Sequence, residues 1–328
     1  MTIQITILGL SQVGASIGLA LAEKKETILR VGNDREPEIA KRAQKLGAVD
    51  QVQHNLPNAV RKADVVILCM PVDEIRQTLE VIAPDLKEGC VVMDTSPVKV
   101  GVSDWALNLL PKDRYFVAMT PTLNPVYLDE AKVGVEAAHA DLFHNSLMVI
   151  TSPTGANADA LKLASDLATL LGSIPFFADA YETDGLMAAV HLLPELVAAA
   201  LVDATMTQPG WSEARKLANR AYAHATHPLL ATTESQFYGQ SALLNKANTL
   251  RVLDNMIASL RTARQSIADG DEEALKSQIG KAVEARFTWE MQRQKADWGL
   301  APAAPLPSSG DIFGRLFGLG RKPKEKKN

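Results

Sequence analysis

Short apolar runs alternate with amphipathic stretches through the first half of the chain. An unbroken apolar run is typical of a strand that is buried on both faces of a parallel sheet. The expected strands are Ile3–Leu8, Thr27–Val31, Val65–Met70, Cys90–Met93 and Leu147–Thr151, and the expected helices between them are Gln12–Glu23, Glu36–Leu46 and Asp73–Ile82. This alternation predicts an α/β domain in which helices cover both faces of a parallel sheet.

The pattern changes near residue 150, where helical spacing replaces the strands. Helices are expected at Ala156–Leu171, Tyr181–Ala204, Ser241–Ile267 and Asp271–Trp298. The second of these is apolar all round, which indicates a helix buried on every side. An all-helical second half with so much apolar surface predicts a homodimer. The expected domains are therefore 1–152, a sheet domain, and 153–298, a helical domain for substrate and dimerisation, followed by a Pro/Ala linker and basic tail at 299–328.

Composition narrows the class of protein. The chain has 328 residues, 47% of them hydrophobic, and a net charge of −4, which argues against a nucleic-acid-binding surface over the whole protein. Two cysteines, Cys69 and Cys90, lie inside apolar runs and are expected to be free thiols in a reducing compartment.

We see no signal peptide and no apolar run long enough to span a bilayer, so the expected location is the cytoplasm. The tail from residue 311 on holds six basic residues against two acids and is expected to be a solubilising tail, with a membrane contact as the alternative.

The first strand runs into a glycine-rich loop, "ILGLSQVGASIG". In a dinucleotide-binding loop the first glycine makes a tight turn, the second lets the backbone approach the pyrophosphate, and the third lets the helix pack on the strand. Gly9 and Gly14 occupy the first and third places, while Ser11 occupies the second. The helix N-terminus still offers free N–H groups to a phosphate, so the loop predicts a weakened but working site in a Rossmann-type domain.

An acidic residue supports the same interpretation. Asp34 follows the second strand, 20 residues after Gly14, where a carboxylate would meet the ribose 2′-hydroxyl and favour NAD. Arg35 beside it leaves NADP open, because an arginine there can accept a 2′-phosphate. The expected cofactor-binding residues are Gly9, Ser11, Gln12, Val13, Gly14, Asp34, Arg35, Met70 and Pro71.

From residue 2 to residue 298 the chain resembles the prephenate/arogenate dehydrogenase family. The segments that carry the resemblance are the loop above, "ADVVILCMPVDEI", "LKEGCVVMDTSPVK", "ADLFHNSLMVITSP" and "YETDGLMAAVHLLPELVAAAL". The resemblance implies a Rossmann domain with a helical dimerisation domain, and oxidative decarboxylation of prephenate or arogenate in tyrosine synthesis. In that reaction hydride passes to the nicotinamide, a base takes the ring hydroxyl proton, and carbon dioxide leaves.

The substrate side departs from the family pattern. Thr120 stands where the family has its proton-handling histidine, and threonine has no useful pKa for a base near neutral pH. Ser96 and Pro97 replace a glycine and a serine, while Asp94 and Lys99 are kept. The family's Ser-His-x-Pro-His pattern reads "HLLPE" at 191–195, so that Glu195 replaces the second histidine.

The expected catalytic residues are therefore His191, Lys99, Arg220 and Thr120. His191, His224 or His227 are the candidate bases, and Lys99 or Arg220, with Arg215 as its rival, are the candidates to hold a carboxylate. Thr122 and Asn124 are either substrate ligands or turn formers. No metal site is expected. Three hypotheses stay open: an altered prephenate/arogenate dehydrogenase, a dehydrogenase of another small carboxylic acid, and a dinucleotide-binding protein without catalysis.

Overall fold

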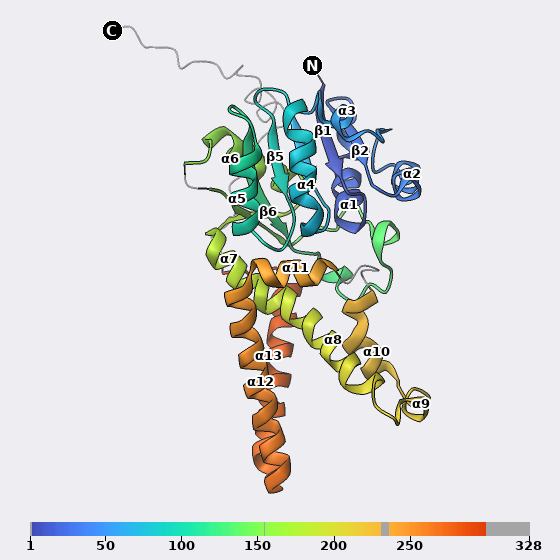
Figure 1. The fold of residues 1–328 in the computed structure, drawn as a ribbon, viewed down its shortest axis with the longest axis vertical. Helices are drawn as coiled ribbons and strands as arrows, with labels where there is room; N and C mark the ends of the chain where they lie inside the picture. The colour runs from blue at the N-terminus through green and yellow to red at the C-terminus, as the bar shows by residue number, and fades with distance from the viewer. Residues whose placement is uncertain (1, 154, 231–235, 300–328) are drawn as a thin grey trace, which may run out of the picture.

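The computed structural model describes residues 2–153, 155–230 and 236–299 of the chain. Its first part is one eight-stranded sheet with the order β3-β2-β1-β4-β5-β6-β7-β8 (Figure 1). The strands are β1 (Ile3–Leu8), β2 (Ile28–Asn33), β3 (Gln51–Val52), β4 (Val65–Leu68), β5 (Val91–Asp94), β6 (Tyr115–Pro121), β7 (Leu147–Thr151) and β8 (Ile174–Phe177). The expected Rossmann-type sheet is confirmed, and its strand order reverses between β1 and β4.

Three strands, β3, β6 and β8, are not among those predicted from the apolar pattern, and one pairing differs in direction. β7 runs antiparallel to β6, with Thr120 opposite Val149, so the sheet is mostly rather than wholly parallel. β8 pairs with β7 beyond residue 152, which corrects the expectation of an all-helical second half. β8 holds Pro175 and lies at the edge of the sheet, where a residue without an N–H is tolerated and the strand pattern is weak.

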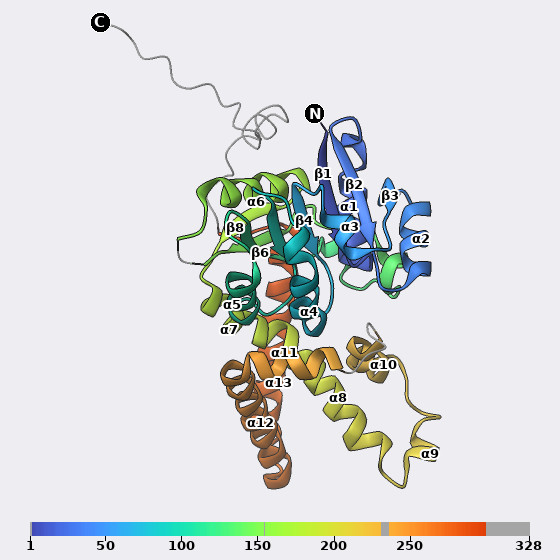
Figure 2. The ribbon, with the colours of Figure 1, turned by 45° about the horizontal axis from the view of Figure 1, so that its top comes forward.

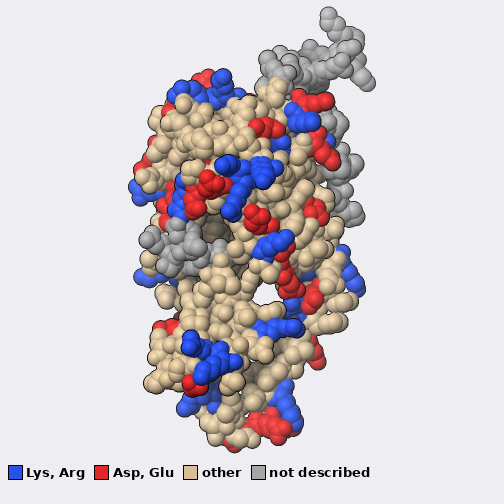
Figure 3. All heavy atoms as spheres, turned by 90° about the vertical axis from the view of Figure 1, so that its right-hand side faces the viewer, with Lys and Arg blue, Asp and Glu red and all other residues tan. Residues whose placement is uncertain are grey.

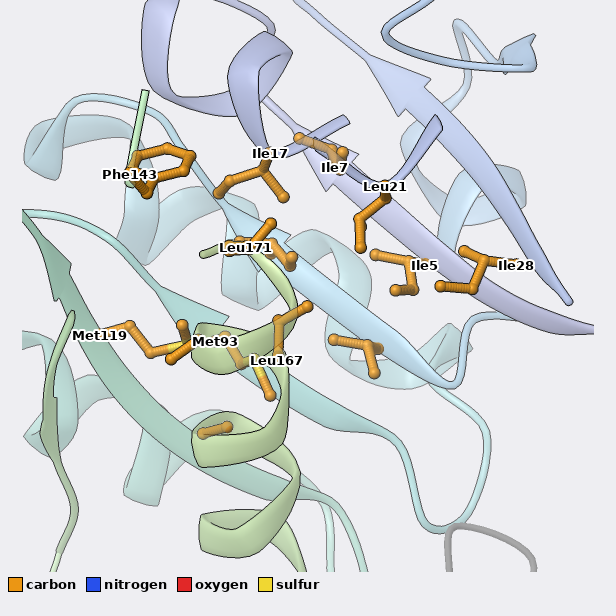
Figure 4. Packing of buried hydrophobic residues seen from close by; sticks show 14 of the residues in the cluster. Ile5, Ile7, Ile17, Leu21, Ile28, Met93, Met119, Phe143, Leu167 and Leu171 are labelled. Carbon is orange, nitrogen blue, oxygen red and sulfur yellow. The ribbon is translucent and has the colours of Figure 1, made fainter. Parts of the chain in front are cut away.

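Helices cover both faces of the sheet. One buried apolar cluster joins the sheet to α1 (Gln12–Ala20), α2 (Pro37–Lys45) and α6 (Ala158–Leu170), and part of it is shown in Figure 4. A second cluster joins the other face to α3 (Leu56–Val60), α4 (Val72–Ile82) and α5 (Val100–Leu109). Successive strand residues alternate between the clusters because side chains in a strand point to opposite faces. Since α6 packs in the first cluster, the sheet part of the structure continues to Phe177.

The helical part lies at one end of the sheet and divides into two arms (Figures 1 and 2). One arm is formed by α8 (Leu193–Met206), α9 (Trp211–Ala214) and α10 (Arg220–Thr226), and the other is the hairpin of α12 (Lys246–Asp269) and α13 (Glu272–Gln294). α7 (Ala180–Met187), the π-helical turn η5 (Ala188–Leu192) and α11 (Gln236–Leu244) connect these arms to the sheet domain. The expected single helix over Ser241–Ile267 is interrupted at Asn245, whose side chain donates to the Asp184 carbonyl at 2.7 Å.

The π-helical turn has a local cause. Pro194 has no N–H to donate to the carbonyl four residues earlier, and its ring would collide with that carbonyl in a regular α-helix. A widened turn just before the proline relieves both problems. His191 lies within this turn.

The long apolar helix is not buried on every side in a single chain, which corrects another expectation. Val190 is 71% exposed and Leu186 is 56% exposed. By length and composition alone, Ala180–Met206 could cross a membrane, because its mean hydropathy reaches 1.9. This finding corrects the statement that no apolar run is long enough to span a bilayer.

The hairpin also exposes large apolar side chains, at Leu250, Ile257, Leu260, Ile267, Ile279, Val283 and Phe287. These surfaces fit contact with a second copy of the chain. The expected linker and basic tail, 299–328, lie outside the described residues except for Gly299.

Candidate active site

The glycine-rich loop has the geometry that close backbone packing requires. Gly9 has a φ of +89°, and a Cβ there would lie 2.3 Å from the Cys69 carbonyl oxygen. A Cβ at Gly14 would lie 1.9 Å from the Gly9 carbonyl oxygen. Both positions therefore need glycine, the first for its backbone conformation and the approach of β4, the second for the packing of α1 on the loop.

Ser11, at the second glycine position, causes no strain. Its φ is −71° and its ψ is −161°, an extended conformation that any residue adopts. It occupies the N-cap of α1, but its side chain makes no capping hydrogen bond and is exposed. The N–H groups at the start of α1 thus keep their phosphate-binding arrangement, and the serine replaces the glycine without deforming the loop.

A cavity of about 530 Å³ opens beside this loop, at the carboxyl ends of β1, β2 and β4. Its lining includes Gly9, Ser11, Asn33, Asp34, Arg35, His54, Met70, Pro71, Glu74, Val133, Gly134 and Leu230. In a sheet of this order, a dinucleotide binds where the strand order reverses, which is the position of this cavity. Figure 3 shows a hollow on this side of the molecule, beneath the sheet domain.

The expected cofactor residues do not all reach the cavity. Gly9, Ser11, Asp34, Arg35, Met70 and Pro71 line it. The Gln12 side chain instead donates to the Ala137 carbonyl at 3.1 Å, and Val13 packs against the apolar cluster. The side chains of Gln12 and Val13 are therefore not part of the cavity lining.

Asp34 closes the loop as well as facing the cavity. Its Oδ2 accepts a hydrogen bond from the Leu10 N–H at 2.8 Å, and its Oδ1 accepts one from the Glu36 N–H at 2.9 Å. These two bonds hold the carboxylate at the end of β2, in the place where a ribose hydroxyl would meet it. Each carboxylate oxygen retains a further lone pair for that contact.

Arg35 is engaged by an acid on a neighbouring helix. Its Nη1 lies 2.6 Å from Oε1 of Glu74, which is on α4. Burial raises the pKa of Glu74, and the Arg35 charge lowers it. Two carboxylates, Asp34 and Glu74, thus line the cavity where a 2′-phosphate on the adenosine ribose would sit. This arrangement favours the cofactor without that phosphate.

We expect Glu74→Gln to tighten the binding of NADP by about tenfold relative to NAD, because it removes one negative charge from the cavity. Titration calorimetry with each cofactor measures the ratio. Glu80→Gln is the matched control, since Glu80 is on the same helix, pairs with Arg76 and does not line the cavity. An unchanged ratio in Glu74→Gln would show that Glu74 does not select the cofactor.

Lys99, an expected catalytic residue, is a core residue. It is fully buried, and its Nζ donates to Oδ2 of Asp94 at 3.0 Å and to the Met119 carbonyl at 3.0 Å, with the Asp94 carbonyl at 3.5 Å. An ammonium group has three N–H donors, and all three are used. The structure therefore places Lys99 as a link between β5 and β6, with no donor left to hold a substrate carboxylate.

Asp184 joins the helical part to the same region, and it was not recognised from the sequence. It lies on α7 and is 4% exposed, and its carboxylate accepts from the Lys99 N–H at 2.6 Å and the Val100 N–H at 3.2 Å, at the start of α5. Burial raises the pKa of Asp184, and these two bonds oppose the shift. A carboxylate at a helix N-terminus is favourable, so Asp184 fixes α7 at the carboxyl edge of the sheet.

Thr120 lies at the carboxyl end of β6. It is 4% exposed, and its Oγ1 has no hydrogen-bond partner among the described residues. Phe116 and Ala118 pack in the cluster beneath α4 and α5, so the alternation along the strand turns Thr120 to that same face. It is a small polar group at the edge where substrates bind in this fold, with no proton-accepting capacity of its own.

Of the two residues left open as substrate ligands or turn formers, Asn124 is a turn former, and Thr122 links the end of β6 to β7. The Thr122 hydroxyl donates to the Leu147 carbonyl at 3.0 Å and accepts from the Leu147 N–H at 2.9 Å. The Asn124 side chain caps the turn η3 (Pro125–Tyr127) through the Val126 N–H at 3.2 Å. Both side chains are thus engaged in hydrogen bonds with the protein backbone.

His191 forms a pair with Glu195, which lies four residues further along the same helix. Their Nε2 and Oε1 atoms are 3.5 Å apart, and Oε2 of Glu195 is buried without a partner among the described residues. Burial raises the pKa of Glu195 to about 8 and lowers that of His191. Both shifts favour the uncharged form of each side chain near neutral pH.

The remaining candidates lie on the other arm. Arg220 and Arg215 are exposed, and the Arg220 side chain makes no hydrogen bond with a described residue. His224 is exposed and His227 is half-buried at the start of η6 (His227–Leu230). Leu230 at the end of this turn lines the cavity, so this arm lies close to the candidate cofactor site.

Within the described residues no group of three or more His, Cys, Asp or Glu side chains is placed to hold a metal ion.

The fold and the loop define a dinucleotide-binding protein of the two-domain dehydrogenase class. Comparison with family models matches residues 17–174 to the nucleotide-binding domain of prephenate dehydrogenase and residues 179–281 to its dimerization domain. The chain belongs to the prephenate dehydrogenase family, and it is a dehydrogenase. The matched dimerization domain supports the expected homodimer.

Individual relatives agree with this assignment. The chain is 27% identical to cyclohexadienyl dehydrogenase of Zymomonas mobilis over 86% of its length and 94% of that protein, and 26% identical to prephenate dehydrogenase of Bacillus subtilis over 83% and 72%. Its fold resembles that of a prephenate dehydrogenase from A. aeolicus in complex with hydroxyphenyl propionate and NAD+, with a TM-score of 0.74 at 21% identity, covering 88% of this chain and 98% of that one. It also resembles Synechocystis arogenate dehydrogenase, with a TM-score of 0.65 at 22% identity, covering 88% and 100%.

Proposed function

We propose that this protein is an NAD-dependent dehydrogenase that oxidatively decarboxylates prephenate or arogenate. The observation that carries the proposal is the junction of its two parts. The cofactor cavity opens at the carboxyl edge of the sheet, and Asp184 anchors the helical part to that same edge. NAD fits the cavity because two carboxylates line it beside the ribose position. The names of the relatives supply the substrate class.

The reaction needs three bond changes at one ring. The C–H bond at the carbon bearing the hydroxyl gives its hydride to NAD. The hydroxyl proton passes to a base. The bond to the ring carboxylate breaks, carbon dioxide leaves, and the electron pair of that bond completes the aromatic ring. The protein must therefore bind the substrate beside the nicotinamide and provide one proton acceptor.

Thr120 stands where the family has its proton-handling histidine, so in this proposal the acceptor is a different group. His191 takes that role, and the ionised form of Glu195 beside it stabilises the imidazolium that forms. Support comes from the 3.5 Å separation of the pair, and from the helix that carries it, whose first turns are fixed at the sheet edge by Asp184. A neutral imidazole is a suitable acceptor, and partial burial keeps His191 neutral by lowering its pKa.

The test is a cofactor-reduction assay that supplies prephenate and arogenate separately, each with NAD and with NADP. Turnover of either substrate with NAD is the expected result. The Thr120→His variant is assayed in parallel, and it should gain little, because the acceptor is already present elsewhere. Bound NAD without turnover of either substrate would contradict the proposal, and would direct attention to other small carboxylic acids or to a role without catalysis.

A further inference from the structure

A surface segment after β6 reaches the cofactor cavity. Residues 128–139, here called the strap, follow the turn η3 and contain the short helix η4 (Gly134–Ala137). Val133 and Gly134, in the middle of the strap, line the cavity. A Cβ at Gly134 would lie 3.9 Å from the Ser11 hydroxyl oxygen, so the strap passes beside the start of α1.

Two hydrogen bonds fasten the strap to α1. The Gln12 side chain donates to the Ala137 carbonyl at 3.1 Å, and the His139 N–H donates to the Ser16 hydroxyl at 3.0 Å. The helix η4 also lies against α2, whose first residue lines the cavity (Figure 2). A cofactor bound at the start of α1 would therefore lie against the strap.

A side-chain pair closes the base of the strap. Nε2 of His139 lies 3.4 Å from Oε2 of Glu130, and the His139 ring stacks on the Tyr127 ring with their centres 4.0 Å apart. The Tyr127 hydroxyl donates to Oδ1 of Asp141 at 2.6 Å, which holds the stack in place. The strap is thus a compact surface loop closed by its own side chains, a form that is frequently functional.

The middle of the strap offers an apolar contact to a ligand. Val133 lines the cavity and is 41% exposed. An apolar side chain gains stability when a ligand removes it from water, so a bound cofactor would hold this part of the strap in its closed position.

The charges around the base of the strap come from several elements. The groups that can carry a charge there, besides Glu130 and His139, are Tyr127, Lys132, Glu136, Asp141 and, from α2, Arg42, which pairs with Glu136 at 3.8 Å. From α1 the strap receives the uncharged side chains of Gln12 and Ser16.

Two of these groups keep one protonation state in the neutral range. The Lys132 N–H, which donates to Glu130 at 3.1 Å, and the His139 side chain lower the pKa of Glu130, so this carboxylate stays ionised. The hydrogen bond with Asp141 raises the pKa of Tyr127 to about 12, so the phenol stays neutral. An imidazole, by contrast, changes its charge between about pH 5 and pH 8.

We propose that the strap is a lid on the cofactor cavity and that the Glu130–His139 pair is its latch, so that NAD leaves faster as the pH rises and the imidazole loses its charge. At the lower pH the two side chains form an ion pair that keeps the lid closed. At the higher pH the attraction between charges is lost and the lid opens more often. The inference requires that NAD binds, and it is independent of the substrate.

The experiment measures the release rate of NADH, displaced by excess NAD in a stopped-flow fluorimeter, at about pH 5.5 and about pH 8. In the unmodified protein the rate should be about two- to fivefold higher at the upper pH, which is the effect of a partly exposed ion pair. In His139→Gln and in Glu130→Gln the rate should be high at both pH values, because neither variant can form the ion pair.

Gln12→Ala tests the lid apart from its latch. Loss of the hydrogen bond to Ala137 should speed release at both pH values and leave the ratio of the two rates unchanged. His144→Gln is the matched control, because His144 is an exposed histidine outside the strap that does not line the cavity. Its release rates should equal those of the unmodified protein, and thermal unfolding at both pH values reports whether each variant is folded.

The variants also separate the latch from a second histidine. His54 lines the cavity and could itself make cofactor release depend on pH. A pH dependence that persists in His139→Gln or in Glu130→Gln would overturn the latch, as would a release rate that is the same at both pH values in the unmodified protein. Unchanged release in Gln12→Ala would overturn the lid. Turnover of prephenate and arogenate is measured without reference to these rates, so the proposed function can fail while the lid stands.

Discussion

Lys99→Met should destabilise the protein by about 3–5 kcal/mol, the largest effect that we expect from a single substitution. Lys99 and Asp94 are both fully buried, and the lysine donates to both β5 and β6. Methionine has a similar length but leaves the Asp94 carboxylate in the core with only the Ser96 N–H and hydroxyl as donors. An uncompensated buried charge is costly because the interior cannot solvate it.

Denaturant unfolding at one fixed protein concentration measures this effect, since a dimer's apparent stability depends on concentration. Lys162→Met is the control. Lys162 is 40% exposed and pairs with Asp166 on the same helix, so its loss should change stability by no more than about 0.5 kcal/mol. Asp94→Asn combined with Lys99→Met should recover part of the loss, because it removes both charges. Equal stability of Lys99→Met and the unmodified protein would disprove the structural role.

His191→Asn should lower kcat by about 10²- to 10⁴-fold if His191 accepts the hydroxyl proton. Asparagine keeps a polar group of similar size but cannot take a proton near neutral pH. Steady-state kinetics with saturating NAD measures the change. His224→Asn is the control, since His224 is exposed on α10. If His224→Asn costs as much as His191→Asn, or if only the former loses activity, the assignment of the base is wrong.

The pH profile tests the partner of His191. Burial raises the pKa of Glu195 to about 8, so the carboxyl is mostly protonated below that pH and ionised above it. The ionised form stabilises the imidazolium, whereas His191 itself is neutral across this range because its pKa is lowered. We therefore expect kcat to increase as the pH rises through about 8 and then to level off. Glu195→Gln should abolish that increase, and its persistence in the variant would exclude Glu195 as its source.

The loop and the cavity of the candidate cofactor site were largely predictable because their signals are local in the sequence. Gly9, Gly14 and Asp34 lie within one strand-loop-helix-strand unit, and the structure places them around one cavity or its loop. The missing second glycine proved harmless for a reason that only the backbone shows, the extended conformation of Ser11. The role of Glu74 was not visible, because it acts across 39 residues on Arg35.

The substrate side was much less predictable. Lys99 matched a family position, yet the structure buries it with all its donors used. Asp184 carried no sequence signal, because it acts on a backbone group 85 residues away in the chain. A lone aspartate on a helix usually faces solvent.

The sequence by itself determined the class of the sheet domain, the nucleotide loop and the helical character of most of the second half. Those features follow from side-chain periodicity and backbone sterics over a few residues, which act wherever the segment lies. Only the tertiary structure decided that β6 and β7 are antiparallel, that β8 extends the sheet, and which polar side chains meet at the junction of the two parts. Those outcomes depend on burial and pairing between distant segments, and a charge reveals its role only when its partner, or the lack of one, is known.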